Sequence, residues 1–292
     1  GIYTNANPGL TPEYVTFRTP TLTELPDDRA DDGVRVVAEF AGRVWYGGFT
    51  SSITDEDTQS PALSSYIFYS QQVKHDSQIG HCYQEGDPTS PDRLDTDGGF
   101  IRLSGAYNVQ KMVNIGSGLM VLAENGVWFV RGSDSGAFNA NNQSVDKISE
   151  RGTLSPGSVV VVDNTIMYWA EDAIYHIAPN DFGSYSSKEI SVNIRDFYQA
   201  IDNDDKLTVQ GDYDSYAKKI RWVYKRGGTS TSTKELVFDV VLAAFFPSSI
   251  GALTTSQVPV APVQVSPYKL GTVGGFRETV YLTLINSEDS NN

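Results

Sequence analysis

The sequence predicts an all-β protein, a β-propeller-like repeat of antiparallel blades with little helix. Three observations predict this fold. Short apolar runs bounded by Gly, Pro, Asn and Asp recur along the chain, as in antiparallel β-proteins. The 292 residues include 16 Tyr and 13 Phe, residue types that are enriched in strands. A hairpin with an aromatic residue in its returning strand recurs at similar intervals, which is typical of repeat architectures.

The clearest hairpin lies within Val113–Gly132. Leu119–Leu122 forms its apolar strand, Ala123–Gly126 its turn and Val127–Val130 the returning strand. Asn125-Gly126 is a strong hairpin signal, because both residues tolerate the positive φ that a primed or bulged turn requires. We therefore expect a positive φ in this turn.

Residues 1–33 contain four prolines and an acidic run, and predict an extended N-terminal segment. Val34–Phe49 predicts a first hairpin turning at Glu39–Gly42. Residues 51–63 read as a polar surface loop, and residues 79–99 as a long ordered loop or insertion. Further strands are expected before the central hairpin at Tyr66–Ser70, Phe100–Leu103 and Gln110–Ile115.

The second half of the chain continues the same alternation of strand and turn. Val159–Pro179 predicts another hairpin, and Ile190–Ile201 is the best helix candidate because its apolar residues are spaced by four and three. We expect a propeller-like domain over residues 34–245 and a Pro- and Gly-rich segment with one further strand over residues 246–292. The remaining expected strands are Lys147–Gly152, Leu207–Gln210, Ile220–Tyr224, Glu235–Val241 and Val280–Ile285.

The predicted repeat is aligned on one aromatic residue in each hairpin: Trp45, Trp128, Tyr175 and Trp222. The intervals are 83, 47 and 47 residues. Propeller blades repeat about every 40–50 residues, so the longer interval is one blade with large loops or two blades with one copy eroded. A sandwich or an irregular β-assembly is the alternative. The chain has no initiator Met and reads as a fragment of a longer protein, so an incomplete propeller is also compatible.

The formal charge of −14 argues against ordinary nucleic-acid binding, which needs clustered Lys and Arg. It does not argue against a surface that DNA slides past without sticking. The single Cys82 excludes an internal disulfide and an all-cysteine zinc site. No apolar run approaches the ~18 residues of a membrane span, and no signal peptide is visible.

We expect no enzyme, and assign no catalytic residue, cofactor or metal ligand. The chain has neither a Gly-x-Ser-x-Gly elbow nor a His-Glu-x-x-His helix. His81 and Cys82 are adjacent, which on a strand directs them to opposite faces. The other histidines are His75 and His176.

Asp95–Gly99 has the alternating carboxylates of a calcium loop but lacks the Glu that completes one, so turn formation explains it more simply and metal binding stays open. Asp202–Asp205 reads as a solvated turn. Ser133–Phe138 partly resembles the Asp-box of sialidase-like propellers, with its Asp one position early and no final Trp. A sialidase also needs clustered arginines, whereas those here are scattered, among them Arg43, Arg93, Arg102, Arg131 and Arg151.

Several short motifs occur in an order that resembles the tail nozzle proteins (tail tubular protein B) of short-tailed bacteriophages. The similarity runs from about residue 34 to residue 200 and thins beyond Leu207. Its motifs are Tyr66–Ser70, Cys82–Gln84, Asp87–Ser90, Asp95–Gly99, Asn125–Trp128, Lys147-Ile148, Gly152–Pro156, Tyr168-Trp169 and Ile174-Tyr175.

The resemblance implies a structural virion protein: a propeller-based protomer of a homohexameric ring below the tail adaptor, contacting tail fibres or spikes. The ring would enclose the channel through which phage DNA is ejected, without specific DNA binding or a membrane span. The alternative is a carbohydrate- or receptor-binding propeller that uses surface aromatic residues as stacking platforms, and a glycosidase is third. For such a ring we expect acidic loops to line the channel, and the candidates are Asp27–Asp32, Asp55–Asp57 and Asp202–Asp205.

Overall fold

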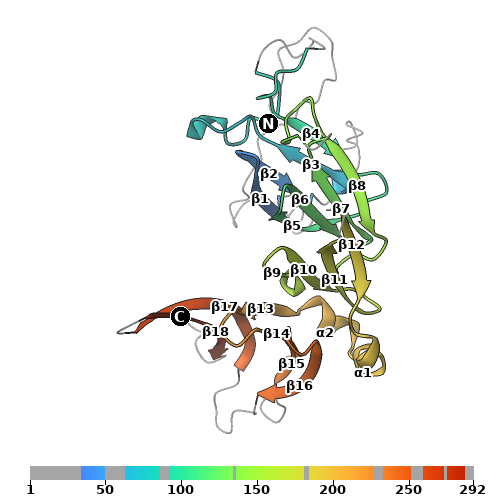
Figure 1. The fold of residues 1–292 in the computed structure, drawn as a ribbon, viewed down its shortest axis with the longest axis vertical. Helices are drawn as coiled ribbons and strands as arrows, with labels where there is room; N and C mark the ends of the chain where they lie inside the picture. Colours follow the sequence, from blue (N-terminus) through green and yellow to red (C-terminus); the bar gives the residue numbers. More distant parts are fainter. Residues whose placement is uncertain are drawn as a thin grey trace. The chain divides into compact units, whose positions relative to one another are not determined.

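The structure is a computed structural model that describes residues 34–49, 63–85, 92–133, 136–180, 184–225, 233–250, 259–272 and 275–286. Within these residues the protein is mostly β, with four antiparallel four-stranded sheets, one two-stranded sheet and little helix (Figure 1). The predicted all-β class is confirmed. The chain divides into two compact units, residues 1–152 and residues 153–292, which are described separately below.

Unit 1 contains two sheets. The strands of the first sheet are β1 (Val36–Phe40), β2 (Arg43–Gly47), β3 (Tyr66–Tyr69) and β4 (Gly99–Arg102). Those of the second are β5 (Val109–Ile115), β6 (Gly118–Ala123), β7 (Gly126–Arg131) and β8 (Ser144–Ser149). Two short 3-10 helices, η1 (Leu63–Ser65) and η2 (Asp76–Gln78), lie in the connections on either side of β3.

Unit 2 contains the other two four-stranded sheets. The third sheet consists of β9 (Val160–Val162), β10 (Thr165–Trp169), β11 (Ile174–Pro179) and β12 (Tyr185–Glu189). The fourth consists of β13 (Gln210–Asp214), β14 (Lys219–Lys225), β15 (Thr233–Asp239) and β16 (Ala244–Ile250). The short helices are η3 (Pro156–Ser158), η4 (Val192–Ile194), α1 (Arg195–Gln199) and α2 (Asn203–Leu207).

All four sheets have the same topology: strands that are consecutive in the chain are neighbours in the sheet, so each sheet is a simple meander. A further pair, β17 (Pro259–Thr272) and β18 (Gly275–Asn286), forms the two-stranded sheet, in the region where the sequence predicted one strand.

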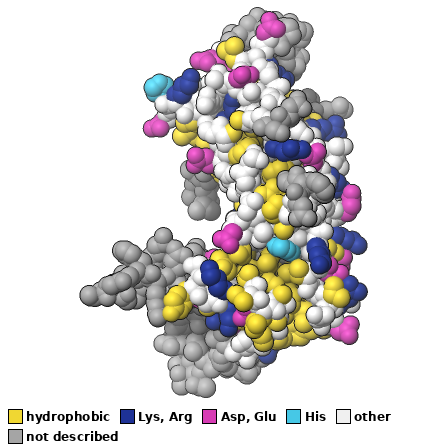
Figure 2. Space-filling view, viewed as in Figure 1, with side chains coloured by type: hydrophobic (Ala, Val, Ile, Leu, Met, Phe, Trp, Pro, Cys, Tyr) yellow, Lys and Arg dark blue, Asp and Glu magenta, His cyan; other side chains and the backbone are white. Residues whose placement is uncertain are grey.

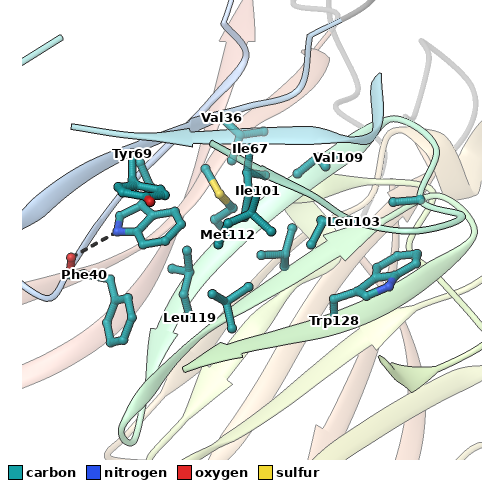
Figure 3. Packing of buried hydrophobic residues seen from close by; sticks show 14 of the residues in the cluster. Val36, Phe40, Ile67, Tyr69, Ile101, Leu103, Val109, Met112, Leu119 and Trp128 are labelled. Atoms are coloured by element: carbon teal, nitrogen blue, oxygen red, sulfur yellow. Dashed lines mark hydrogen bonds between the residues drawn. The ribbon is translucent and has the colours of Figure 1, made fainter. Parts of the chain in front are cut away.

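The two sheets of unit 1 share one hydrophobic core. Trp45 and Tyr69 of the first sheet are buried in the same cluster as Met112, Leu119 and Trp128 of the second (Figure 3). The indole Nε1 of Trp45 donates a hydrogen bond of 3.0 Å to the carbonyl oxygen of Phe40, drawn as the dashed line in Figure 3. The buried ring therefore leaves no indole donor unsatisfied.

Unit 2 has a core of the same kind between its two four-stranded sheets. Trp169 of β10 contacts Trp222 of β14 and Tyr198 of α1, with ring centroids 6.0 and 5.0 Å apart. The Nε1 of Trp222 donates to the carbonyl oxygen of Ser158 at 2.8 Å. Each unit is thus a pair of meanders held together by buried aromatic side chains.

The predicted repeat aligned aromatic residues that lie on different strands of their sheets, so the alignment was wrong. Trp45 and Trp222 lie on β2 and β14, the second strands of their sheets, whereas Trp128 and Tyr175 lie on β7 and β11, the third strands. The interval of 83 residues and the second interval of 47 residues therefore do not join equivalent positions, and only the interval from Trp128 to Tyr175 does. Both inner strands of a meander are covered by neighbours and both favour aromatic residues, so an aromatic residue alone does not identify the strand.

The central hairpin is confirmed, but the reason given for its glycine was wrong. Ala123 pairs with Gly126, so the turn residues are Glu124 and Asn125, and the φ of Gly126 is not in the left-handed region. A Cβ at Gly126 would lie 2.9 Å from the ring of Trp128. Glycine is required at position 126 because the ring of Trp128 leaves no room for a side chain there. The primed turn occurs instead between β1 and β2, at Ala41 (φ 54°) and Gly42 (φ 66°).

The predicted helix at Ile190–Ile201 is present as η4 followed by α1. Asp202–Asp205, read as a solvated turn, instead begins α2, and the strand predicted at Leu207–Gln210 begins only at Gln210 because Leu207 ends that helix. Several other predictions lie outside the described residues: those on residues 1–33, 51–62 and 87–90.

Gly211 provides a test of the packing in unit 2. It pairs with Trp222 across β13 and β14, and a Cβ there would lie 2.1 Å from the indole Cδ1. We expect Gly211→Ala to lower the free energy of unfolding by about 1–3 kcal/mol, the usual effect of overpacking, measured by urea denaturation. Gly47→Ala is the matched control, because its nearest atoms lie at 3.4 Å. Equal effects of the two substitutions would contradict the packing described here.

Candidate functional site

A buried guanidinium organises the loops of the first sheet. Arg43 of β2 is 2% exposed. Its Nη1 donates to the carbonyl oxygens of Ser70 at 2.7 Å and Thr96 at 3.3 Å, and also to that of Asp97. Its Nη2 donates to the carbonyl oxygen of Asp95. Burial lowers the pKa of Arg43, whereas the charges of Asp97 and Asp95 favour its charged form.

Asp97 ties the same region together through its own side chain. Its buried carboxylate accepts hydrogen bonds from the backbone N–H groups of Glu85 at 2.9 Å and Leu94 at 2.8 Å. Gly98 follows, where a Cβ would lie 2.2 Å from the carbonyl oxygen of His81. We call the arrangement of Arg43, Ser70 and Asp95–Asp97 the arginine hub.

The arginine hub explains the alternating carboxylates of Asp95–Gly99 without a metal. The backbone carbonyls of the segment face a guanidinium, and the carboxylate of Asp97 caps two amides. Among the described residues, no group of three or more His, Cys, Asp or Glu side chains could hold a metal ion.

The segment that partly resembles an Asp-box belongs to the same assembly within unit 1. Phe138, in the connection between β7 and β8, packs against Trp45 and Tyr69 with centroid distances of 4.9 and 5.3 Å. Nearby, Asn141 Nδ2 donates to the carbonyl oxygen of Arg93 at 2.7 Å. Asp134 lies outside the described residues. The aromatic position of this segment is therefore a core position rather than part of a sugar-binding turn.

Cys82, His75 and His81 belong to unit 1, and His176 belongs to unit 2. Burial raises the pKa of the Cys82 thiol to about 12, and the neighbouring His81 ring contacts Tyr83 at 5.0 Å. His176 lies in unit 2, on β11 opposite Lys188, and burial lowers its pKa. A thiol with such a raised pKa is a poor nucleophile near neutral pH.

The acidic segment Asp202–Asp205 is fixed in place by a buried lysine. Lys206 of α2 is buried, and its Nζ donates to the carbonyl oxygen of Glu171 at 2.9 Å and lies 4.7 Å from the centre of the Tyr198 ring. Burial lowers the pKa of Lys206. Asp202 and Asp204 remain exposed. Lys206 points inward, whereas Asp202 and Asp204 point into solvent. Of the three acidic loops predicted from the sequence, this is the one within the described residues, and the buried lysine fixes its position.

The motif Gly152–Pro156 forms a hydroxyl network, which the sequence did not predict. Thr153 Oγ1 donates to the carbonyl oxygen of Trp169 at 3.1 Å, and Ser155 Oγ to that of Val209 at 3.0 Å. Ser158 Oγ accepts from the backbone N–H of Trp169 at 3.2 Å. The network links β10 to the segment that enters β13. The only indication of this network in the sequence is the clustering of small polar residues at Thr153, Ser155 and Ser158.

An aromatic group lies on the face of the first sheet opposite the Trp45 cluster, where Phe68 is buried with Tyr46, Phe49 and Cys82 and Tyr66 packs partly buried against them. Tyr66, Phe68 and Phe100 follow one another across β3 and β4, and Phe100 is 54% exposed. The ring centroids of Tyr66 and Phe100 are 5.8 Å apart, and the Arg102 guanidinium lies 5.9 Å from the Tyr66 ring centre.

Figure 2 shows charged side chains of both signs spread over the visible surface. Apolar side chains gather on this face where α2, β13 and β14 lie in Figure 1.

No family model matches the chain, and no curated protein matches it. Among the described residues no helix is long and apolar enough to cross a membrane.

The arginine hub predicts that Arg43 is among the most sensitive positions of unit 1. We expect Arg43→Met to lower the free energy of unfolding by about 3 kcal/mol, because it leaves several buried carbonyls without a donor. Chemical denaturation measures the change. Arg131→Met is the control, since Arg131 pairs with Asp146 at 3.2 Å in a half-exposed ion pair, which is worth about 0–1 kcal/mol. A stable Arg43→Met protein would argue against the hub.

Proposed function

We propose that the chain is a structural virion protein, a subunit of a tail nozzle ring that forms part of the conduit for phage DNA. The observation that carries the proposal is the repeated topology. Each of the four sheets is a four-stranded antiparallel meander in chain order, which is the form of a propeller blade. A propeller-based protomer is what the ordered motifs imply for this chain.

The positions of the motifs support the same proposal. Asp95–Gly99 belongs to the arginine hub, Asn125–Trp128 to the central hairpin, and Gly152–Pro156 to the hydroxyl network. These residues fix loops to buried strands and so make the protein rigid. Rigidity supports the proposal because a conduit requires a rigid scaffold. The resemblance carries no catalytic residues over to this chain.

The charge of the chain also suits a channel for DNA. Six copies would carry a formal charge of −84, six times the −14 of one chain. An acidic wall repels the duplex and prevents the multiple phosphate contacts that would slow its passage. Asp202 and Asp204, held at the surface by the anchored α2, are the described candidates for such a wall.

One observation favours a second function, a carbohydrate- or receptor-binding module. Phe100 is exposed beside Tyr66, and Arg102 lies over the Tyr66 ring. Exposed aromatic rings with an adjacent cation form a stacking platform for a sugar or a planar group.

The mass of the purified chain in solution separates the two functions. The conduit predicts a particle of about 192 kDa, six times the 32.0 kDa of one chain, and a six-fold ring in negative-stain images. Mass photometry measures the first and microscopy the second. A 32.0 kDa monomer that binds glycans, and loses binding in Phe100→Ala, would contradict the conduit and support the second function.

A further inference from the structure

Two turns lie side by side at one end of the fourth sheet. The β13–β14 turn spans residues 215–218, and the β15–β16 turn spans residues 240–243. In an antiparallel meander, alternate turns fall at the same end of the sheet. The backbone N–H of Val240 donates to the carbonyl oxygen of Lys218 at 3.0 Å, which joins the two turns directly.

The two turns are built in the same way. Asp214 Oδ1 accepts from the N–H groups of Tyr216 at 3.0 Å and Ala217 at 2.9 Å. Asp239 Oδ1 accepts from the corresponding groups of Val241 and Leu242, both at 3.0 Å.

The last residue of each turn has a positive φ, 55° at Lys218 and 50° at Ala243. An aspartate at the end of each strand therefore fixes the conformation of the turn that follows it.

These turns expose large apolar side chains at equivalent positions. Tyr216 is 63% exposed, Val241 75% and Leu242 66%. Val241 and Leu242 have the largest exposed fractions among the large hydrophobic residues described. We call Tyr216, Val241 and Leu242 the apolar tip.

Most of the backbone N–H groups in the apolar tip already donate hydrogen bonds within the protein, which favours transfer of the tip to an apolar environment. The N–H groups of Tyr216, Ala217, Val241 and Leu242 are bonded to carboxylates, and that of Val240 to a carbonyl. Moving an unsatisfied N–H out of water costs several kcal/mol in hydrocarbon. For these five N–H groups the cost is already met by hydrogen bonds within the protein.

We propose that the apolar tip inserts into the interfacial region of a lipid bilayer. Three side chains offer on the order of a few hundred Å² of apolar surface, well below the roughly 800 Å² per partner of a specific protein interface. Shallow insertion of a convex tip needs no matching pocket.

The charges around the tip fit a bilayer surface. Lys218 and Lys219 lie at its base, where ammonium groups meet lipid phosphates, and tyrosine is a favoured residue at the interface. The carboxylates nearby are those of Asp214 and Asp239; each caps its turn, and Asp239 also lies 3.9 Å from the Lys219 Nζ. The base of the tip is therefore close to neutral and is compatible with zwitterionic lipid.

A fluorescent label at position 242 tests the proposal. Leu242→Cys is labelled with the environment-sensitive dye NBD; the only other thiol, Cys82, is buried and has a pKa raised to about 12, so it reacts slowly. With phosphatidylcholine vesicles we expect a blue-shifted emission and a several-fold rise in intensity. Val37→Cys, labelled at a side chain that is 60% exposed in unit 1, is the control and should not respond.

A second variant separates lipid from other partners. Val241→Asp/Leu242→Asp should reduce co-flotation with the same vesicles by about tenfold or more, since it places charges where the proposal inserts aliphatic side chains into the bilayer, while circular dichroism stays unchanged because both side chains are exposed in the free protein. No emission change with vesicles would overturn the proposal. A change that follows protein concentration without lipid would overturn it in favour of contact with a second copy.

Discussion

The buried guanidinium of Arg43 is the constraint on which unit 1 depends. A buried Arg charge is tolerated only where its donors are satisfied, and here the acceptors are carbonyls of Ser70 and the 95–97 segment. Those segments are far apart in sequence, and each is held in place by the same group. Phe138 then closes the aromatic cluster beside Arg43, with the ring centre 5.9 Å from the guanidinium carbon.

In unit 2 the loops around the aromatic core are fixed by buried hydroxyl groups, and α2 is fixed by the buried Lys206. The hydroxyls of Thr153, Ser155 and Ser158 bond to backbone groups around Trp169, and Trp222 donates to the Ser158 carbonyl. In both units, loops are fixed to the aromatic core by buried polar side chains. The turns of the apolar tip are fixed separately, by the carboxylates of Asp214 and Asp239, which accept hydrogen bonds from the backbone N–H groups of the turns.

The fold class was predictable because its signals are local. Alternating apolar residues and turn residues identified β3, β6 and β7 to within one or two residues. The arginine hub was not predictable, because Arg43 and Asp97 are 54 residues apart and nothing near either one indicates the contact. The repeat was aligned wrongly for a related reason. Both inner strands of a meander are buried and carry aromatic residues, so the sequence does not show that Trp128 lies on a third strand and Trp222 on a second strand. The apolar tip was not predicted, because the apolar Val241 continues the run that predicted a strand at Glu235–Val241, whereas that strand ends at Asp239 and Val241 lies in the turn.

The central claim is that four meanders act as blades of one propeller-like protomer within a ring. A cryo-EM reconstruction of the purified assembly, at a resolution that separates strands, tests it most directly. The account predicts six copies around one axis, with the four sheets of each copy arranged radially about a local axis and α2 facing the lumen. Sheets stacked as isolated sandwiches in a particle without rotational symmetry would contradict it.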